Sequence, residues 1–184
     1  MEKNFDLQPH LENSIVIISP LKKQDFEKLF EAASDPLLWE QHPNKDRYKR
    51  EVFENFFKGA LESGGAFIVY NAVTNEVIGS SRYYGYLPEE KSVSIGYTFI
   101  KRSCWGGKYN RALKKLMLDH AFNHVEKVYF HIGANNIRSQ KAILKLKAEK
   151  TGEADIEYYG EAPYRNFIYT MTKDKWKSIS SDVM

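Results

Sequence analysis

The chain has 184 residues, 42% of them hydrophobic, which is enough for one sizeable core and too little for a second independent domain. Its formal net charge of +3 is far from the strongly basic balance of proteins that bind nucleic acid. The single cysteine, Cys104, excludes an intrachain disulfide and the common Cys/His zinc clusters. We therefore expect one domain over 1–176, a polar tail over 177–184, a reducing cytoplasmic compartment and no bound metal.

The first residues, 1–10, are charged and polar where a signal peptide requires an apolar run. The strongest early apolar stretch, 15–18, is far shorter than the roughly 20 residues that cross a bilayer. We expect a protein that is neither exported nor embedded in a membrane.

Hydrophobic periodicity predicts two helices in the first half of the chain. Phe26, Leu29 and Phe30 recur at helical spacing and stop before Asp35, which precedes a proline. A second apolar set repeats at intervals of three and four and is stopped by a glycine pair. The expected elements are a strand at 14–19, helices at 23–33 and 52–61, and hairpin strands at 66–71 and 77–84.

The second half alternates strands and helices. Val93, Ile95 and Tyr97 alternate with small or polar residues, which is the period of a half-buried strand. The next helix is amphipathic, and we expect four of its polar residues to point away from the apolar face: Arg111, Lys114, Lys115 and Asp119. The expected elements are a strand at 92–100, a helix at 109–121, a strand at 128–132, a helix opening at 135–136, and strands at 155–159 and 166–172.

This order predicts a mixed α/β fold, with a central, mostly antiparallel sheet of about seven strands and helices on both faces. The strands at 92–100 and 128–132 flank a helix and can pair in parallel. Ligands commonly dock beyond the carboxyl end of a strand that feeds a helix. We therefore expect a binding site at the turn between Ile100 and Tyr109.

Two adjacent glycines mark that turn. Gly106 and Gly107 expose backbone N–H groups where the dipole of the following helix is positive, so the turn favours an anionic ligand. Four basic residues can neutralise further phosphate charge: Lys101, Arg102, Lys108 and Arg111. Taken alone, the glycine pair is equally consistent with a plain tight turn and a solvated basic rim.

The stretch from Ser92 to Ala148 resembles the GNAT superfamily of N-acetyltransferases, particularly its RimJ/RimL branch, through the runs SVSIGYTFIKRSCWGGKYNRALKKLMLDHAF and VYFHIGANNIRSQKAILKLKA. The resemblance implies acetyl-CoA as cofactor, with its pyrophosphate on a loop led by Arg102 and its pantetheine arm near an Asn-x-x-Ser element. The residues expected to bind the cofactor are Tyr97, Thr98, Phe99, Ile100, Arg102, Trp105, Gly106, Gly107, Lys108, Tyr109, Asn110, Asn136 and Ser139.

The chain departs from the family pattern at three positions that bear on chemistry. Lys108 stands where the family usually has a second small residue, so the lysine either blocks a backbone N–H or binds phosphate itself. Ile143 replaces a tyrosine that many members carry, which excludes a tyrosine acid there. Ser94 replaces a glutamate that many members carry, so a general base must come from elsewhere.

Acetyl transfer to an amine needs a stabilised oxyanion, a neutral amine and a proton for the leaving thiolate. Backbone N–H groups over 97–100 are expected to hold the oxyanion. Ser139 is the candidate acid by family analogy, although it can equally be an ordinary helix-surface serine. Glu40 and His42 are the candidate bases, with a solvated loop as the structural alternative. His131 can point into the cleft or be a satisfied structural histidine.

The acceptor pocket is expected at the loop 36–46, where GNAT proteins often form it, with Trp39, Glu40, His42 and Tyr84 as the contacts. The acceptor is an amine, either a peptide N-terminus or a small molecule, attacking directly in a ternary complex. A homodimer stays open, and nucleic acid and membrane partners are not expected.

Three alternatives remain beside the active transferase. Acetyl could pass through Cys104 as a covalent thioester, but no histidine is adjacent to it in sequence. The protein could hold acyl-CoA without turnover, since the usual glutamate and tyrosine are absent. The basic residues near the glycine turn could bind a polyanion, although their helical spacing is more simply that of an exposed face.

Overall fold

The computed structural model describes residues 4–182, which fold around one eight-stranded sheet in the order β1-β2-β3-β4-β5-β6-β8-β7. The strands are β1 (Leu11–Glu12), β2 (Val16–Pro20), β3 (Ala66–Asn71), β4 (Val77–Leu87), β5 (Ser92–Ile100), β6 (Lys127–Gly133), β7 (Glu149–Ile156) and β8 (Tyr164–Thr172). The α-helices are α1 (Phe26–Ala33), α2 (Arg50–Glu62), α3 (Tyr109–Ala121), α4 (Ile137–Lys145) and α5 (Lys173–Ile179). The predicted mixed, mostly antiparallel fold is confirmed, and the additional strand is the two-residue β1.

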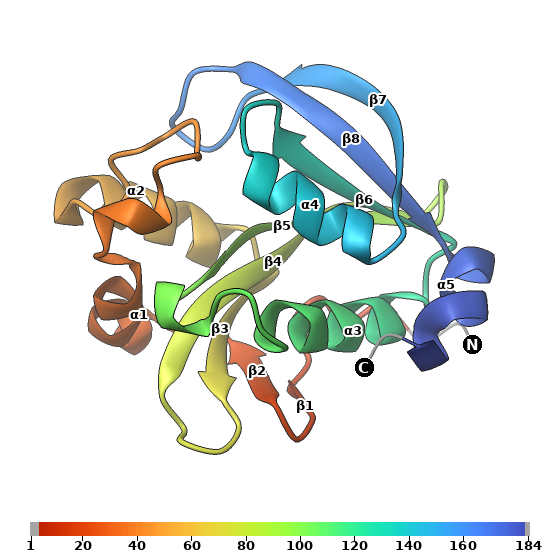
Figure 1. Ribbon diagram of the computed structural model, residues 1–184, viewed down its shortest axis with the longest axis horizontal. Coiled ribbons are helices and arrows are strands. Elements are labelled where there is room, and N and C mark those ends of the chain that lie inside the picture. The colour runs from red at the N-terminus through yellow and green to blue at the C-terminus, as the bar shows by residue number, and fades with distance from the viewer. Residues whose placement is uncertain (1–3, 183–184) are drawn as a thin grey trace.

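Helices cover both faces of the sheet (Figure 1). One core lies under α3 and α4 and contains Leu113, Met117 and Ile143, while a second, aromatic core lies under α1 and α2 and contains Phe53 and Phe56. Each helix forms because its apolar residues recur on one stripe that the sheet can bury. The sheet therefore has a face toward α3 and α4 and an opposite face toward α1 and α2.

The parallel contact between β5 and β6 opens the sheet at its centre. The two strands pair only over the first three residues of β5, from Ser92↔Lys127 to Ser94↔Tyr129. All other neighbouring strands pair antiparallel. Since β5 continues to Ile100 and β6 to Gly133 without further pairing, the strands diverge and leave a gap that side chains from both faces can line.

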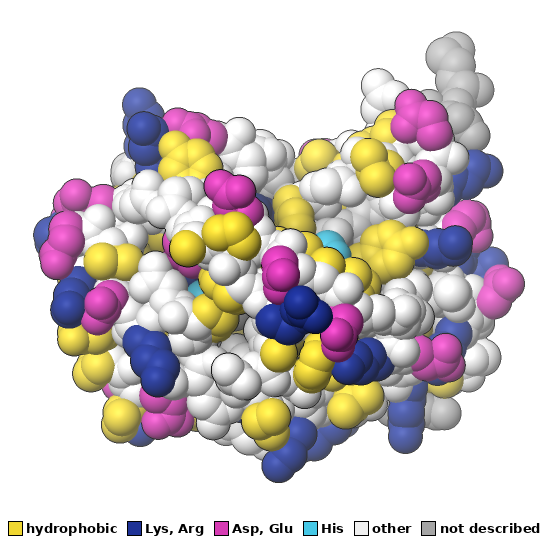
Figure 2. All heavy atoms as spheres, turned by 90° about the horizontal axis from the view of Figure 1, so that it is seen from above, with side chains coloured by type: hydrophobic (Ala, Val, Ile, Leu, Met, Phe, Trp, Pro, Cys, Tyr) yellow, Lys and Arg dark blue, Asp and Glu magenta, His cyan; other side chains and the backbone are white. Residues whose placement is uncertain are grey.

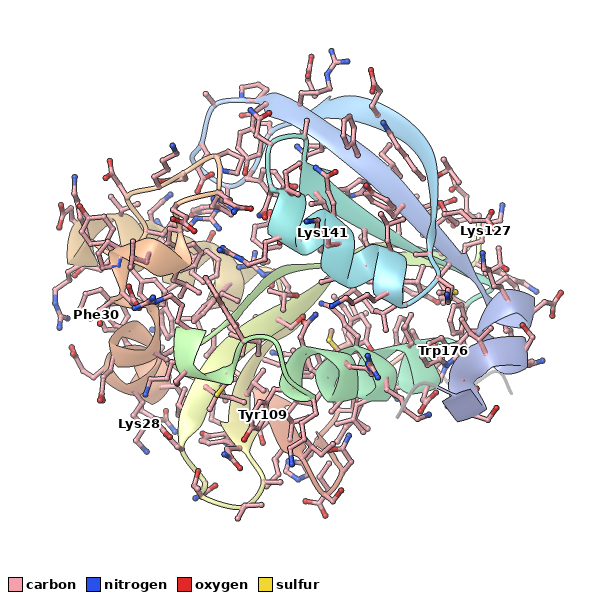
Figure 3. All side chains as sticks on the ribbon, viewed as in Figure 1. Lys28, Phe30, Tyr109, Lys127, Lys141 and Trp176 are labelled. Carbon is pink, nitrogen blue, oxygen red and sulfur yellow. The ribbon has the colours of Figure 1, made fainter. Side chains whose placement is uncertain are left out.

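The C-terminal elements differ from the expected ones. The strand expected at 155–159 is β7, which begins six residues earlier at Glu149 and ends at Ile156. The domain end expected at 176 falls inside α5. Trp176 itself packs into the domain, since it is buried and its indole N–H donates to Asp119 at the far end of α3 (Figure 3). The expected tail continues α5 to Ile179, and its last two residues lie outside the described range.

Candidate active site

A cavity of about 250 Å³ lies where β5 and β6 diverge, between the first turns of α3 and α4. It extends from the glycine turn, through the gap in the sheet, to side chains on the opposite face. Its lining includes Leu38, Trp39, His42, Arg47, Gly96, Tyr97, Thr98, Phe99, Ile100, Cys104, Trp105, Gly106, Gly107, Asn110, Lys114, Phe130, His131, Asn136, Arg138, Ser139, Ile143, Tyr158, Tyr164 and Asn166. One continuous site thus connects an anion-accepting turn with a group of titratable side chains.

A β-bulge shapes the wall of the cavity on β5. Pairing with β4 runs from Phe99↔Ser80 to Gly96↔Arg82, so two residues of β5 face one residue of β4. Tyr97 lies in this bulge and has a positive φ of 52°, which is a strained conformation for a residue other than glycine. The bulge interrupts the regular pairing of β5 at the cavity, at the strand end expected to hold the oxyanion.

The glycine turn is open to a ligand. Gly106 has a φ of 70°, and a Cβ added there would meet no atom within 4 Å. The following helix, α3, begins without a side-chain cap at Lys108. Arg138, from α4, lies over the Trp105 ring, with its guanidinium carbon 3.9 Å from the centroid, and both residues line the cavity. The turn therefore combines free backbone surface with a positive helix end and a nearby cation.

Three residues expected to bind the cofactor do not line the cavity. Arg102 donates through Nε to Asp35 at 2.5 Å, and Lys108 is exposed on the outer side of the turn. The Tyr109 hydroxyl accepts from the Asn71 side chain on the side of α3 that faces away from α4 (Figure 3). The cation that lines the cavity beside the turn is Arg138, which is carried by α4.

Asn136 and Ser139 meet at the start of α4. The Asn136 side chain accepts a hydrogen bond of 3.1 Å from the backbone N–H of Ser139 and thereby caps the helix. Asn136 is buried, and both side chains line the cavity. The Asn-x-x-Ser element therefore fixes the entry of α4 and presents the Ser139 hydroxyl to the cavity.

The loop before α2 brings only part of the expected acceptor contacts together. Trp39 is buried, donates its indole N–H to Ala33, and lines the cavity together with His42. Glu40 does not line the cavity, because its carboxylate turns outward and lies 3.5 Å from Arg138. Glu40 is thus on the rim, away from the reacting centre.

His42 is held by its neighbours. Its Nε2 lies 3.2 Å from Nη1 of Arg47, and its Nδ1 lies 3.2 Å from the Asn44 carbonyl oxygen. Because arginine can only donate, the Nε2 lone pair is engaged by Arg47, and Nδ1 also lies 3.0 Å from the backbone nitrogen of Asn44. Burial first, and then the Arg47 charge, hold the pKa of His42 well below its usual value. His42 lines the cavity as expected, while its Nε2 lone pair is engaged by Arg47.

Arg47 forms the charged floor of this part of the cavity. Only 3% of its side chain is exposed, and it donates to Glu161 Oε1 at 2.6 Å. The Glu161 carboxylate also accepts from Asn44 at 3.0 Å, which ties the loop before α2 to the loop before β8. This buried ion pair positions His42, and Tyr158 and Tyr164 lie beside it with pKa values raised by burial.

A tyrosine–histidine pair lies at the point where the strands diverge. The Tyr84 hydroxyl, from β4, lies 2.7 Å from Nδ1 of His131, from β6. The contact crosses β5 at Gly96, whose absent side chain leaves room for the Tyr84 ring. His131 lines the cavity, and its Nε2 has no hydrogen-bond partner within residues 4–182. Burial lowers the pKa of His131, which favours the neutral imidazole.

Lys114 corrects the predicted face of α3. It was expected to point into solvent, but its side chain is 3% exposed and lines the cavity. Its spacing explains the error, because Lys114 shares a buried stripe with Met117, Leu118 and Ala121 at intervals of three, four and seven residues. Charge suggested a solvated face, whereas position in the stripe would have predicted burial.

The molecule is an α/β protein with a cavity between two diverging parallel strands. An open glycine turn suited to an anion lies at one end of the cavity, and titratable side chains lie at the other. Residues 16–149 match the family model described as an acetyltransferase (GNAT) domain. The chain therefore belongs to the GNAT acetyltransferases, enzymes that transfer acetyl groups from acetyl-CoA. A search of curated proteins gave no match.

Solved structures support the fold. A GCN5-related N-acetyltransferase from Brucella melitensis is 15% identical, with a TM-score of 0.84 over 96% of this chain and 84% of that chain. A GNAT-family acetyltransferase from Bacillus anthracis is 16% identical, with a TM-score of 0.72 over 90% and 99%. Spermidine N-acetyltransferase from Vibrio cholerae, in complex with CoA and spermine, is 15% identical, with a TM-score of 0.68 over 90% and 99%.

Among residues 4–182, no helix is long and apolar enough to cross a membrane, and no three His, Cys, Asp or Glu side chains are grouped as metal ligands.

Proposed function

We propose that the protein is an acetyl-CoA-dependent N-acetyltransferase that moves an acetyl group to a primary amine by direct attack in a ternary complex. The observation that carries this proposal is the single cavity that joins the open turn at Gly106 and Gly107 to His131 at the divergence of the strands. A cofactor with a pyrophosphate at one end and a thioester at the other matches the two ends of this cavity.

The cofactor fits the residues present. The N–H groups of Gly106 and Gly107 and the start of α3 would hold the pyrophosphate, with Arg138 adding charge. The bulge at Tyr97 and the α4 entry at Ser139 would flank the pantetheine arm. Bound acetyl-CoA supplies the activated thioester, and the protein supplies alignment and proton transfer.

His131 is the base that the geometry favours. A neutral amine is required for attack, and the Nε2 lone pair of His131 faces the cavity while Tyr84 fixes the ring through Nδ1. In the tautomer that leaves the Nε2 lone pair free, Nδ1–H donates to the Tyr84 hydroxyl oxygen, and Nε2 can take a proton from the acceptor ammonium. Ser139, which lines the cavity from α4, would donate a hydrogen bond to the departing sulfur.

The acceptor is proposed to be a peptide N-terminus or a small amine. The family transfers acetyl groups to amines, and one structural neighbour is a spermidine N-acetyltransferase in complex with CoA and spermine. Membership of the RimJ/RimL branch rests on the tryptophan-glycine turn and the Asn-x-x-Ser element. The cytoplasmic location stays a proposal that rests on the single cysteine.

A polyanion partner has less support. Lys and Arg side chains are intermixed with Asp and Glu over the face seen in Figure 2, and Arg102 and Lys115 are both ion-paired. A binder of nucleic acid would instead show a continuous basic surface.

The test is the release of free thiol from acetyl-CoA in the presence of panels of peptide N-termini, polyamines and amino acids. We expect amine-dependent thiol release, and a rise in melting temperature with acetyl-CoA alone. Stabilisation by acetyl-CoA without thiol release for any amine would overturn catalysis in favour of an acyl-CoA-binding module. Absence of both effects would remove the cofactor assignment itself.

A further inference from the structure

Lys114 is a buried amine that packs beside the cavity without a carboxylate partner among residues 4–182. Its Nζ donates to Thr98 Oγ1 at 2.5 Å and lies 3.5 Å from Ser81 Oγ. The two hydroxyls are 2.8 Å apart and come from the strands that form the bulge. The Phe130 ring, from β6, lies 5.9 Å from Nζ. Hydroxyls and an aromatic ring therefore replace the usual counter-ion.

A buried lysine without a counter-ion lowers the stability of the folded protein, which points to a functional role for Lys114. Burying an ammonium without an opposite charge disfavours the charged form strongly. The groups packed against Nζ from β4, β5 and β6 are neutral, and burial alone lowers the pKa of Lys114 to about 7. Both the ammonium and the amine are thus populated near neutral pH, which is the condition for exchanging a proton with a ligand.

We propose that Lys114 is the proton donor to the thiolate of coenzyme A when acetyl transfer breaks the thioester. This inference rests on the proposed function. Lys114 projects from α3 on the same face of the helix as Asn110, four residues nearer the glycine turn, and both line the cavity. A cofactor that enters at Gly106 and extends toward the bulge must pass them in that order.

The amine nitrogen forms a bond to the acetyl carbon, and the carbon–sulfur bond breaks with its electron pair on sulfur. The Lys114 ammonium transfers one proton to that sulfur, giving the free thiol and a neutral Lys114 amine. His131 passes to solvent the proton that it took from the acceptor ammonium. The nitrogen loses a second proton to solvent as the amide forms, and Lys114 regains one proton from solvent before the next cycle, so that one proton is released overall. No oxidant or further reactant is needed.

Lys114 can supply a proton to the departing sulfur, which the neighbouring residues cannot. Ile143 also lines the cavity and has no proton to give. The Ser139 hydroxyl can donate a hydrogen bond, but it is too weak an acid to give up its proton to a thiolate near neutral pH. The Thr98 hydroxyl accepts from Lys114 and fixes the direction of Nζ.

The first experiment titrates the thiol of bound coenzyme A through the ultraviolet absorbance of the thiolate, with free coenzyme A as reference. A Cys104→Ser background removes the protein thiol that lines the same cavity, and the spectrum of the ligand-free protein is subtracted. The Lys114 ammonium should lower the thiol pKa of bound coenzyme A, whereas Lys114→Met should return it to that of free coenzyme A. Equal titrations in both proteins would overturn the proposal.

The second experiment follows turnover. Lys114→Met should lower kcat roughly 100-fold or more, with the affinity for coenzyme A within a few-fold of the parent, because general acids contribute about 10²- to 10⁴-fold. Lys115→Met is the matched control, since Lys115 is ion-paired to Asp119 on the outer surface of α3. A Lys114→Met variant that keeps kcat within about threefold would also overturn the proposal.

The two experiments separate this inference from the proposed function. The thiol titration needs no acceptor, so it reports on Lys114 even if the correct amine has not been found. A wild-type protein that binds coenzyme A but shows no amine-dependent thiol release would contradict the proposed function. Normal turnover in Lys114→Met would contradict only the role of Lys114.

Discussion

The hydroxyl of Tyr84 lies 2.7 Å from Nδ1 of His131, although the two residues belong to strands that β5 separates. The contact exists because β5 and β6 have already diverged at this level and because Gly96 leaves the path across β5 open. It fixes the ring of a histidine that lines the cavity.

His131→Ala should lower kcat/KM roughly 100-fold, because the neutral imidazole takes the proton from the acceptor amine. Burial places the pKa of His131 below its usual 6.5, so wild-type activity should fall as pH decreases through that lowered pKa. The variant should lose this acidic limb of the pH–rate profile. Tyr84→Phe should retain the limb with a smaller, about tenfold loss. An unchanged acidic limb in His131→Ala would assign the base elsewhere.

Gly96→Ala should disturb the same pair from the opposite side of the contact. A Cβ at position 96 would lie 2.9 Å from Cε1 and 3.2 Å from the hydroxyl of Tyr84, so the tyrosine must move away from His131. We expect a loss in kcat close to that of Tyr84→Phe, and the double variant should be no worse than either single one. Independent, additive losses measured in this cycle would show that Gly96 acts through something other than Tyr84.

The fold and half of the site could be predicted from the sequence because their signals are local. The periodicity of β5 and α3 and the glycine pair gave the position of the turn, and Asn136 with Ser139 gave the entry of α4. These features depend on residues that are neighbours along the chain.

The rest depends on contacts that no local pattern encodes. The positive φ of Tyr97 comes from a register shift against β4, and an aromatic residue gives no hint of it. His131 and Tyr84 meet across a third strand. Glu40 and His42 are two residues apart in one loop, yet only His42 lines the cavity. Lys114 could have been found by giving its place in the buried stripe more weight than its charge.

Gly107→Asp should weaken acetyl-CoA binding without straining the backbone. The position has no positive φ, and a Cβ there would meet nothing closer than 4.0 Å, so the new carboxylate would simply stand in the phosphate site. We expect the stabilisation by acetyl-CoA in thermal unfolding to be largely lost, while the ligand-free melting temperature changes little. Gly152→Asp, on β7, is the control, since its Cβ would also make only ordinary contacts. Equal acetyl-CoA stabilisation in both variants would show that the pyrophosphate binds elsewhere.

Ser139→Ala should lower kcat about tenfold and leave the affinity for acetyl-CoA nearly unchanged, because only the hydroxyl is lost. The cap of α4 survives, since Asn136 accepts from the backbone N–H of residue 139. The informative measurement is the cycle with Lys114→Met. If both groups act on the same sulfur, the double variant should lose less than the product of the single losses. A full-rate Ser139→Ala variant would remove the hydroxyl from the mechanism.

Lys114→Met should change how the free energy of unfolding depends on pH. The pKa of Lys114 is about 7 in the folded protein and returns to its ordinary 10.5 on unfolding, so the unfolded chain binds more protons between these values. Wild-type stability therefore gains from Lys114 as pH rises through this window, by about 2 kcal/mol from about pH 7 to pH 9. Lys114→Met should lack that gain and be relatively most stable at the lower pH. Urea unfolding at both pH values measures the difference, with Lys115→Met as control. If the unfolding free energy changes equally with pH in wild type and Lys114→Met, the pKa of the buried amine does not lie near 7.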